Sequence, residues 1–173
     1  GTLPKTDYTK KLITQAVLQV NTIAETLATI KREMLSLSSL LPEYSIVMAM
    51  HGVGESLGPQ LMAEIGDVRR FHSKHALVAF AGIDAPPYQS GTYFAQSRSI
   101  SKRGSTVLRK TLFQVMACIL KLSTVDEPIY QFLDKKRAEG KHFYVYMMAG
   151  ANKFLRVYYA RVKEHFDRLE SAA

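Results

Sequence analysis

Residues 44–66 read YSIVMAMHGVGESLGPQLMAEIG, two short apolar segments on either side of a turn that contains glycine. Gly52 and Gly54 flank Val53 in this turn, and glycine allows a positive φ and a close approach of the backbone to a neighbour. The backbone N–H groups that begin the second helix then face an anion, and the helix dipole adds to the attraction. The segment predicts a helix-hairpin-helix that grips a DNA phosphate through Gly52, Val53 and Gly54. A purely structural turn between two helices is the alternative.

The residues before this segment carry a heptad repeat. Its apolar positions are Ile13, Val20, Leu27, Met34 and Leu41, with Ala16, Ile23, Ile30 and Leu37 three positions further on. This is the a/d spacing of a coiled-coil seam, which must be buried against another surface. Thr6 or Asp7 is suited to cap the start of the helix, and Pro42 is expected to end it. Residues 1–43 therefore predict a coiled-coil helix, and we expect a homo-oligomer formed through it.

Helical signals also fill the chain after the hairpin. Capping residues and apolar spacing predict helices over residues 74–80, 106–122, 129–139 and 142–169. The side chains expected to face the core from the second and fourth of these are Leu108, Leu112, Val115, Ile119, Leu122, Phe143, Met147, Ala151, Phe154, Tyr158, Val162 and Leu169. Strand signals are weak, and residues 92–94 offer the best chance of a short hairpin. The expected fold class is mainly α.

The composition is that of a soluble globular protein with excess positive charge. The chain has 173 residues, 47% apolar and 22% charged, which suits one domain with a helical extension. A net charge of +8 predicts an anionic partner, first of all nucleic acid, although a solvated basic surface has the same composition. The single cysteine, with no signal peptide and no apolar span, predicts a cytoplasmic protein without membrane contact. Because the sequence begins Gly-Thr, we expect a piece of a longer protein.

The candidate chemistry lies in residues 81–110, AGIDAPPYQSGTYFAQSRSISKRGSTVLRK. Ser90 stands between Gln89 and Gly91 in a loop shaped by two prolines. Gln89 and Gly91 are expected to contact DNA beside it. The residues of the following run that are expected to contact DNA are Arg98, Ser101, Lys102, Arg103, Gly104, Ser105 and Arg109. The cations suit phosphate, and the helix start at Ser105 suits a second phosphate. Ser90 is either a nucleophile or an ordinary turn residue, because nothing nearby activates its hydroxyl. The histidines and scattered carboxylates show no metal-binding spacing.

Several ordered motifs point to one family. They are Gly-Val-Gly, Ala-Glu-Ile-Gly-Asp, Ala-Phe-Ala-Gly-Ile-Asp-Ala-Pro, Tyr-Gln-Ser-Gly, Ile-Ser-Lys-Arg-Gly-Ser and Leu-Arg-Lys. Over residues 44–160 the chain resembles the C-terminal transposase domain of bacterial insertion-sequence transposases of the IS110, IS116 and IS902 type, also called bridge recombinases. The resemblance implies that Ser90 is the recombination nucleophile, which forms a phosphoserine link to DNA. It also implies that residues 100–104 contact DNA.

The same resemblance implies parts that this sequence does not contain. Members of the family carry an N-terminal RuvC-like domain whose carboxylates bind metal, so Mg²⁺ is expected in the full-length enzyme and none in this fragment. A guide (bridge) RNA encoded by the element is the further expected partner. Residues 1–43 are then the coiled coil and residues 44–173 the transposase domain, with the helix-hairpin-helix at 44–66 and the nucleophile loop and basic run at 82–105. This fragment alone is expected to bind DNA weakly without recombining it.

Two other functions remain open at this point. One is a non-catalytic helix-hairpin-helix module of a repair or junction-processing protein, which would bind DNA without using Ser90. The other is a helical interaction domain whose coiled coil is its purpose. A transposase domain or a helix-hairpin-helix module would bind DNA with an affinity that falls steeply as salt rises. A DNA affinity that hardly falls with salt would support the interaction domain.

Overall fold

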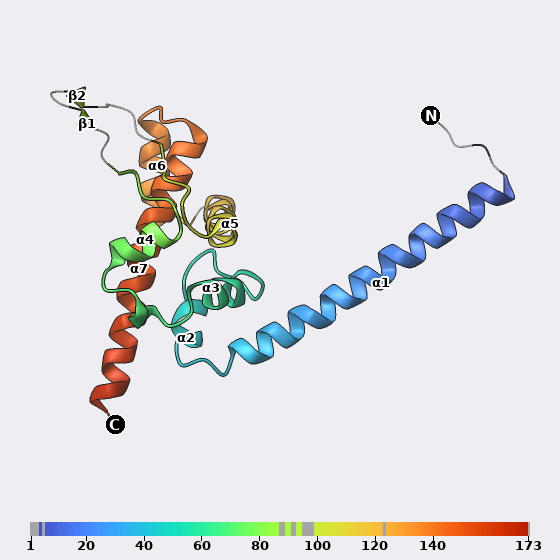
Figure 1. Cartoon of the computed structure of the whole chain (residues 1–173), viewed down its shortest axis with the longest axis horizontal. Helices are drawn as coiled ribbons and strands as arrows, with labels where there is room; N and C mark the ends of the chain where they lie inside the picture. The colour runs from blue at the N-terminus through green and yellow to red at the C-terminus, as the bar shows by residue number, and fades with distance from the viewer. Residues whose placement is uncertain are drawn as a thin grey trace. The chain divides into compact units, whose positions relative to one another are not determined.

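The computed structural model describes residue 4 and residues 6–86, 89–90, 93–94, 99–122 and 124–172; for 89–90 and 93–94 it describes the backbone only. The described chain is mainly α, as predicted (Figure 1). Its elements are α1 (Asp7–Ser38), α2 (Tyr44–Met48), α3 (Leu57–Ile65), the 3-10 helix η1 (Val68–Arg70), α4 (Lys74–Phe80), β1 (Gln89–Ser90), β2 (Tyr93–Phe94), α5 (Thr106–Leu122), α6 (Pro128–Ala138) and α7 (Phe143–Ser171).

The contacts divide the chain into two units between Leu37 and Ser38. The first unit is almost entirely α1, whose start is capped as predicted, because the Thr6 hydroxyl accepts a hydrogen bond from the Thr9 N–H at 3.2 Å. The prediction that Pro42 ends this helix was wrong, since α1 stops at Ser38. Leu41 lies in a turn, where its N–H donates to the Ser38 carbonyl, so the last heptad position falls outside the helix.

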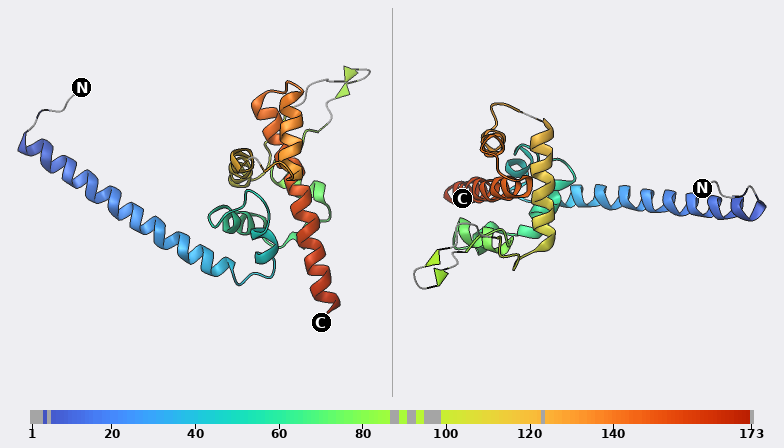
Figure 2. Two further views of the ribbon diagram at one scale, coloured as in Figure 1. Left: turned by 180° about the vertical axis from the view of Figure 1, so that it is seen from behind. Right: turned by 90° about the horizontal axis from the view of Figure 1, so that it is seen from above.

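The second unit is built around α7. Helices α2, α4, α5 and α6 all contact α7, and Figure 2 shows α5 crossing it steeply. The buried side chains of α7 include Met147, Ala151, Phe154, Tyr158 and Val162, as predicted from their spacing. None of the described helices is long and apolar enough to cross a membrane.

Three of the predicted core positions were wrong. Phe143, Leu169 and Leu122 are 42%, 45% and 62% exposed. Each lies in the first or last turn of its helix. The apolar spacing therefore continues further along α5 and α7 than the burial of the side chains does.

The predicted helix starts are confirmed by their caps. The Ser73 hydroxyl accepts from the Ala76 N–H at 3.2 Å, and the Ser105 hydroxyl accepts from the Leu108 N–H at 3.0 Å. Pro128 opens α6 behind the N-cap residue Glu127. These local signals set where the connecting segments of the second unit begin and end.

Gly52 has a structural reason to be glycine. Its φ is 77°, and an added Cβ would lie 2.5 Å from Ile119 Cγ1 and 2.9 Å from the Val115 carbonyl oxygen. The turn between α2 and α3 therefore packs directly on α5. Gly54 has open space around it, and Val53 is buried. Phosphate binding by Gly52, Val53 and Gly54 stays a prediction, beside a packing role for Gly52 that is observed.

Candidate functional site

The basic run, residues 99–105, is attached through its backbone to the C-terminal end of α4 and the residues that follow it. The Ser101 N–H donates to the Asp84 carbonyl at 2.8 Å, and the Lys102 N–H donates to the Gly82 carbonyl at 3.0 Å. The Ser105 N–H completes the set with a 2.8 Å bond to the Phe80 carbonyl. These bonds satisfy carbonyl groups at the C-terminus of α4 and in the segment just after it, and they fix the path of the run.

Gly104 and Lys102 show how tightly the run is held. A Cβ added at Gly104 would overlap the Phe80 carbonyl oxygen and lie 2.5 Å from the Gly82 nitrogen, so no other residue fits. Lys102 has a φ of 56°, in the left-handed region that costs a residue with a Cβ about 1–2 kcal/mol. The surrounding backbone hydrogen bonds compensate for this strain and hold the segment in one conformation.

Several side chains predicted to bind DNA have partners inside the fold. Ser101 donates its hydroxyl to the Asp84 carboxylate. Ser105, besides capping α5, donates to the Glu64 carboxylate at 2.8 Å, and Arg109 Nη1 donates to the Ala81 carbonyl at 3.0 Å. Arg109 thus places a cation at the C-terminus of α4, where the helix dipole is negative. Of the described residues in the predicted DNA-binding run, Lys102 and Arg103 are the exposed cations.

A cleft of about 1240 Å³ runs along one face of α7, bounded by α6 and by the segments on either side of residues 86–98. The cations that line it are Lys74, Lys102, Lys153, Arg156 and Arg161. No acidic residue is among the described residues that line the cleft. Such a surface, with one sign of charge along a groove, attracts a polyanion.

The floor of the cleft is apolar. Ile83, Ile100, Met148 and Val157 line it, and two aromatic rings, Phe132 and Tyr144, contribute to its walls. Tyr144 is 63% exposed. The cleft therefore combines a cationic margin with an apolar surface that is open to solvent.

The cations of the cleft differ in how firmly they are held. Lys153 Nζ donates to the Pro128 carbonyl at 2.9 Å and lies 4.8 Å from the centre of the Phe132 ring. Lys74, Lys102, Arg156 and Arg161 form no ion pair with any acidic residue in the described part of the chain. These four side chains are available to an anionic ligand.

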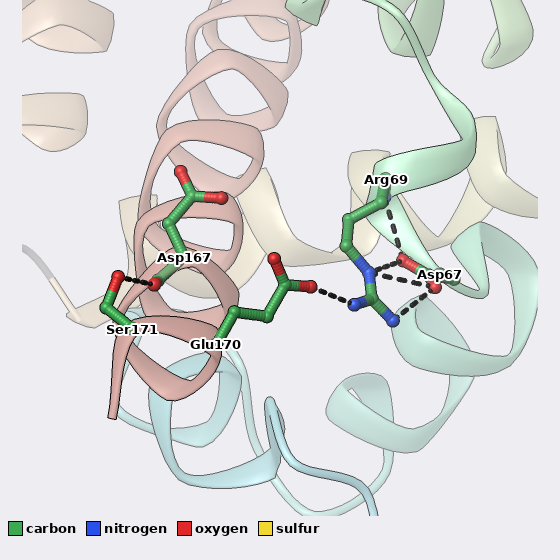
Figure 3. Close-up of polar contacts among 5 residues, drawn as sticks. All are labelled: Asp67, Arg69, Asp167, Glu170 and Ser171. Carbon is green, nitrogen blue, oxygen red and sulfur yellow. Dashed lines mark hydrogen bonds and ion pairs between the residues drawn. The ribbon is translucent and has the colours of Figure 1, made fainter. Parts of the chain in front are cut away.

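The arginines at residues 69 and 70 are not available in the same way. Arg69 lies between Asp67 and Glu170, with N–O distances of 2.8 and 2.7 Å (Figure 3). The hydrogen bonds that Arg69 donates lower the pKa of the Asp67 carboxyl, and its hydrogen bonds to the carboxylates of Asp67 and Glu170 raise the pKa of Arg69. Arg70 donates to the Ile65 carbonyl and lies over the rings of Phe71 and Phe80.

The Ser90 segment joins the cleft at both of its ends. Gln89 and Ser90 pair antiparallel with Phe94 and Tyr93, which confirms a short hairpin. Ala85 before this segment and Ser99 after it both line the cleft. Ser90 lies five residues after Ala85, so its Cα is within roughly 18 Å of that rim. The predicted DNA contacts Gly91 and Arg98 lie outside the described residues, as do the side chains of Gln89 and Ser90.

Sequence reasoning missed most of the cleft. Lys74, Lys153, Arg156, Arg161 and Tyr144 were not among the predicted contacts, because α7 was read only for its buried face. A signal was present, since residues 141–163 contain several cations and no acidic residue. Among the described residues, no three His, Cys, Asp or Glu side chains come together as a metal site.

Comparison with known proteins places the chain in a family. A sequence profile of the transposase family IS116/IS110/IS902 matches residues 44–131, just over half of the chain. The chain is also similar to the insertion element IS900 uncharacterized 42 kDa protein of Mycobacterium paratuberculosis, with 27% identity over 121 residues. The similarity covers 69% of this chain and 29% of that relative, so the chain spans less than a third of its length. The match from α2 to the first turn of α6 shows that the chain belongs to the IS116/IS110/IS902 family of transposases.

Proposed function

We propose that this chain is the DNA-binding and nucleophile-bearing domain of a transposase, and that Ser90 attacks a DNA phosphodiester. The observation that carries the proposal is the cationic cleft, together with the attachment of the Ser90 segment to its rim at Ala85 and Ser99. A DNA strand held along α7 would then run past both ends of the segment that carries the Ser90 hydroxyl. The family membership supports the same conclusion, because transposases act on DNA.

The proposed reaction exchanges phosphodiester bonds without oxidation or reduction. The Ser90 hydroxyl oxygen attacks phosphorus, the Oγ–P bond forms, and the bond from phosphorus to one sugar oxygen breaks. The hydroxyl gives up its proton, and the departing sugar oxygen takes up a proton. Attack on the phosphoserine by a sugar hydroxyl of another strand reverses these changes and restores Ser90. Lys102 and Arg103 are exposed near the rim and suited to stabilise the charge on the phosphate oxygens.

The described residues contain no group of three or more His, Cys, Asp or Glu side chains that could hold a metal ion. We propose that a RuvC-like domain elsewhere in the longer protein binds the Mg²⁺ expected from the resemblance. No step of the reaction is assigned to that ion. The guide RNA is likewise proposed for the full-length protein, and sequencing of RNA that copurifies with it tests this part separately.

The test uses the full-length transposase and an end-labelled DNA substrate, with covalent adducts trapped by denaturation. The wild type should give a protein–DNA adduct whose modified peptide contains phosphoserine 90. Ser90→Ala should reduce the adduct by at least about a thousandfold while DNA affinity is unchanged.

The matched control is Ser171→Ala, because the Ser171 hydroxyl is exposed and donates to the Asp167 carbonyl at the end of α7 (Figure 3). This control should form the adduct at the wild-type level. An adduct that persists in Ser90→Ala contradicts the assignment of the nucleophile. A full-length protein that binds DNA and recombines it equally well with or without the Ser90 hydroxyl would also contradict it.

We also propose that α1 pairs with α1 of a second copy. Its heptad side chains are exposed, with Val20 at 64%, Ile23 at 60% and Leu37 at 67%. A seam of this kind is stable in water only when another helix covers it. Ile23→Asp should convert an oligomer into a monomer in analytical ultracentrifugation. Asn21→Asp adds the same charge outside the seam and should leave the oligomer intact; a wild-type chain that sediments as a monomer contradicts the pairing.

A further inference from the structure

The cleft along α7 has a surface that double-stranded DNA does not match. A duplex presents phosphates and sugars outward and keeps its bases stacked inside. The apolar floor formed by Ile83, Met148 and Val157 would then have no apolar partner. An unpaired nucleotide offers both a phosphate for a cation and a flat apolar face for this floor.

Tyr144 stands in the wall of the cleft as an exposed ring with aromatic neighbours. Its ring lies 5.7 Å from that of His142 and 6.0 Å from that of Phe113, at interplanar angles of 30° and 27°. Phe143 packs edge-on against the same ring at 5.4 Å. A ring supported in this way loses little freedom when a base stacks on it, and stacking on aromatic side chains is how proteins hold single strands.

The spacing of the cations fits a strand that runs along the helix. Lys153, Arg156 and Arg161 of α7 line the cleft together with Tyr144, and the distance along the helix from Tyr144 to Arg161 is roughly 25 Å at the rise of an α-helix. That length accommodates several nucleotides of an extended strand. Lys102 and Lys74 add charge from the other side of the cleft.

We propose that this cleft binds single-stranded DNA, with unpaired bases stacked at Tyr144 and phosphates held by Arg156 and Arg161. The inference rests on the proposed function and narrows its substrate to an unpaired segment of the DNA. It requires that the duplex be opened before a strand enters the cleft. It does not depend on which residue is the nucleophile.

The test measures binding of the full 173-residue chain by fluorescence anisotropy. The probes are an oligo-dT of roughly 12 nucleotides, the duplex of the same length, and the RNA of the same sequence. The single-stranded DNA should bind about tenfold more tightly than the duplex and more tightly than the RNA. Tyr144→Ala should weaken single-strand binding by about tenfold, and Tyr144→Phe should restore it because the ring remains.

The matched control is Tyr8→Ala, which removes another exposed tyrosine ring, from α1, and should bind like the wild type. Circular dichroism checks that each variant is folded. A second readout needs no variant: a strand that carries 2-aminopurine should lose fluorescence when its base stacks in the wild-type cleft.

Equal or tighter binding of the duplex overturns the inference, as does tighter binding of the RNA. Unchanged binding by Tyr144→Ala, or unchanged 2-aminopurine fluorescence, overturns the stacking. The adduct assay at Ser90 is independent of these results. An adduct at Ser90 without a preference for single-stranded DNA would support the proposed function and overturn this inference. A preference for single-stranded DNA without an adduct would contradict Ser90 as the nucleophile and support single-strand binding in the cleft.

Discussion

Arg69 and Arg70 lie beside carboxylates and aromatic rings, whereas Arg156 and Arg161 line a cleft without an acidic partner among the described residues. Both pairs carry the same charge, and a count of basic residues does not distinguish them. The first pair holds η1 to its neighbours and to the end of α7. The second pair leaves its charge open to a ligand. The net charge of +8 is therefore informative about function only after the cations with internal partners have been set aside.

The largest expected effect is at Gly104, whose substitution should disrupt the basic run beside the cleft. Gly104→Ala should lower the free energy of unfolding by about 3 kcal/mol or more, because the added Cβ would meet backbone atoms that are unable to move aside. Urea unfolding measures the change. Gly54→Ala is the control, since nothing lies within 4 Å of an added Cβ there. Equal stability of the two variants would show that the run is not anchored as described.

The next effect concerns Arg156 and Arg161, the arginines that line the cleft. Arg156→Gln with Arg161→Gln should weaken DNA binding by roughly tenfold to a hundredfold and leave the melting temperature unchanged, because both side chains are exposed. The slope of log affinity against log salt concentration should fall by about 1.4, or about 0.7 for each phosphate contact on a single strand. An unchanged slope would mean that these arginines do not contact phosphate.

Substitution in the other pair, Arg69 and Arg70, should lower stability and leave DNA affinity unchanged. Arg70→Gln removes the bond to the Ile65 carbonyl and the contacts with Phe71 and Phe80, so it should lower the free energy of unfolding by about 1 kcal/mol. DNA affinity should stay at the wild-type value. A loss of affinity without a loss of stability would end the distinction between the two pairs.

Lys102 contributes a charge to the cleft and also has a left-handed backbone conformation. Two substitutions separate these properties. Lys102→Gly relieves the left-handed backbone and should stabilise the fold by up to about 1 kcal/mol, whereas Lys102→Ala keeps the strain. Both variants should weaken DNA binding equally, since both remove the same charge from the cleft. Thermal unfolding and anisotropy measured on the same samples check the two statements, and equal stability of the variants would contradict the strain.

The smallest effect is a pH dependence at Asp67. Its pKa is lowered from 3.8 by Arg69, so its contribution to stability is present above the unfolded pKa and is lost as the pH falls through the folded pKa. Because the ion pair is exposed, the loss should be less than about 1 kcal/mol. Urea unfolding between about pH 5 and pH 2 should show this loss in the wild type and not in Asp67→Asn. Parallel pH profiles would contradict it.

Much of the fold follows from short-range signals in the sequence. Ser73 and Ser105 cap their helices with their own hydroxyls, and Pro128 lacks an N–H at a helix start, where that N–H would have no partner within the helix. These boundaries therefore need no information from distant residues. The ends of the apolar stripes were misjudged because Leu122 and Leu169 keep the helical spacing after their neighbours have ended. Apolar periodicity predicts which side of a helix faces the core. How much of that side is buried depends on where the other helices lie.

The candidate site was only half predictable for the same reason. The basic run is contiguous in sequence and was found, but Arg109 turned out to hold the end of α4, a partner that lies 28 residues earlier. The cleft is assembled from α4, α6, α7 and the run, which no single stretch of sequence contains. Only the absence of acidic residues over 141–163 announced it, and that signal requires the second face of α7 to be considered together with the first.

The contact between Gly104 and the Phe80 carbonyl also sets a limit on how this protein can evolve. Every single-nucleotide change of a glycine codon that alters the residue adds a Cβ, so each such change meets the same backbone oxygen. Position 104 should therefore resist drift in any relative that keeps α4 and the basic run packed together, whether or not that relative still recombines DNA. An Ile-Ser-Lys-Arg-Gly match in a distant genome would then report inheritance of the architecture, and an intact Ser90 would have to be sought separately as the mark of retained chemistry.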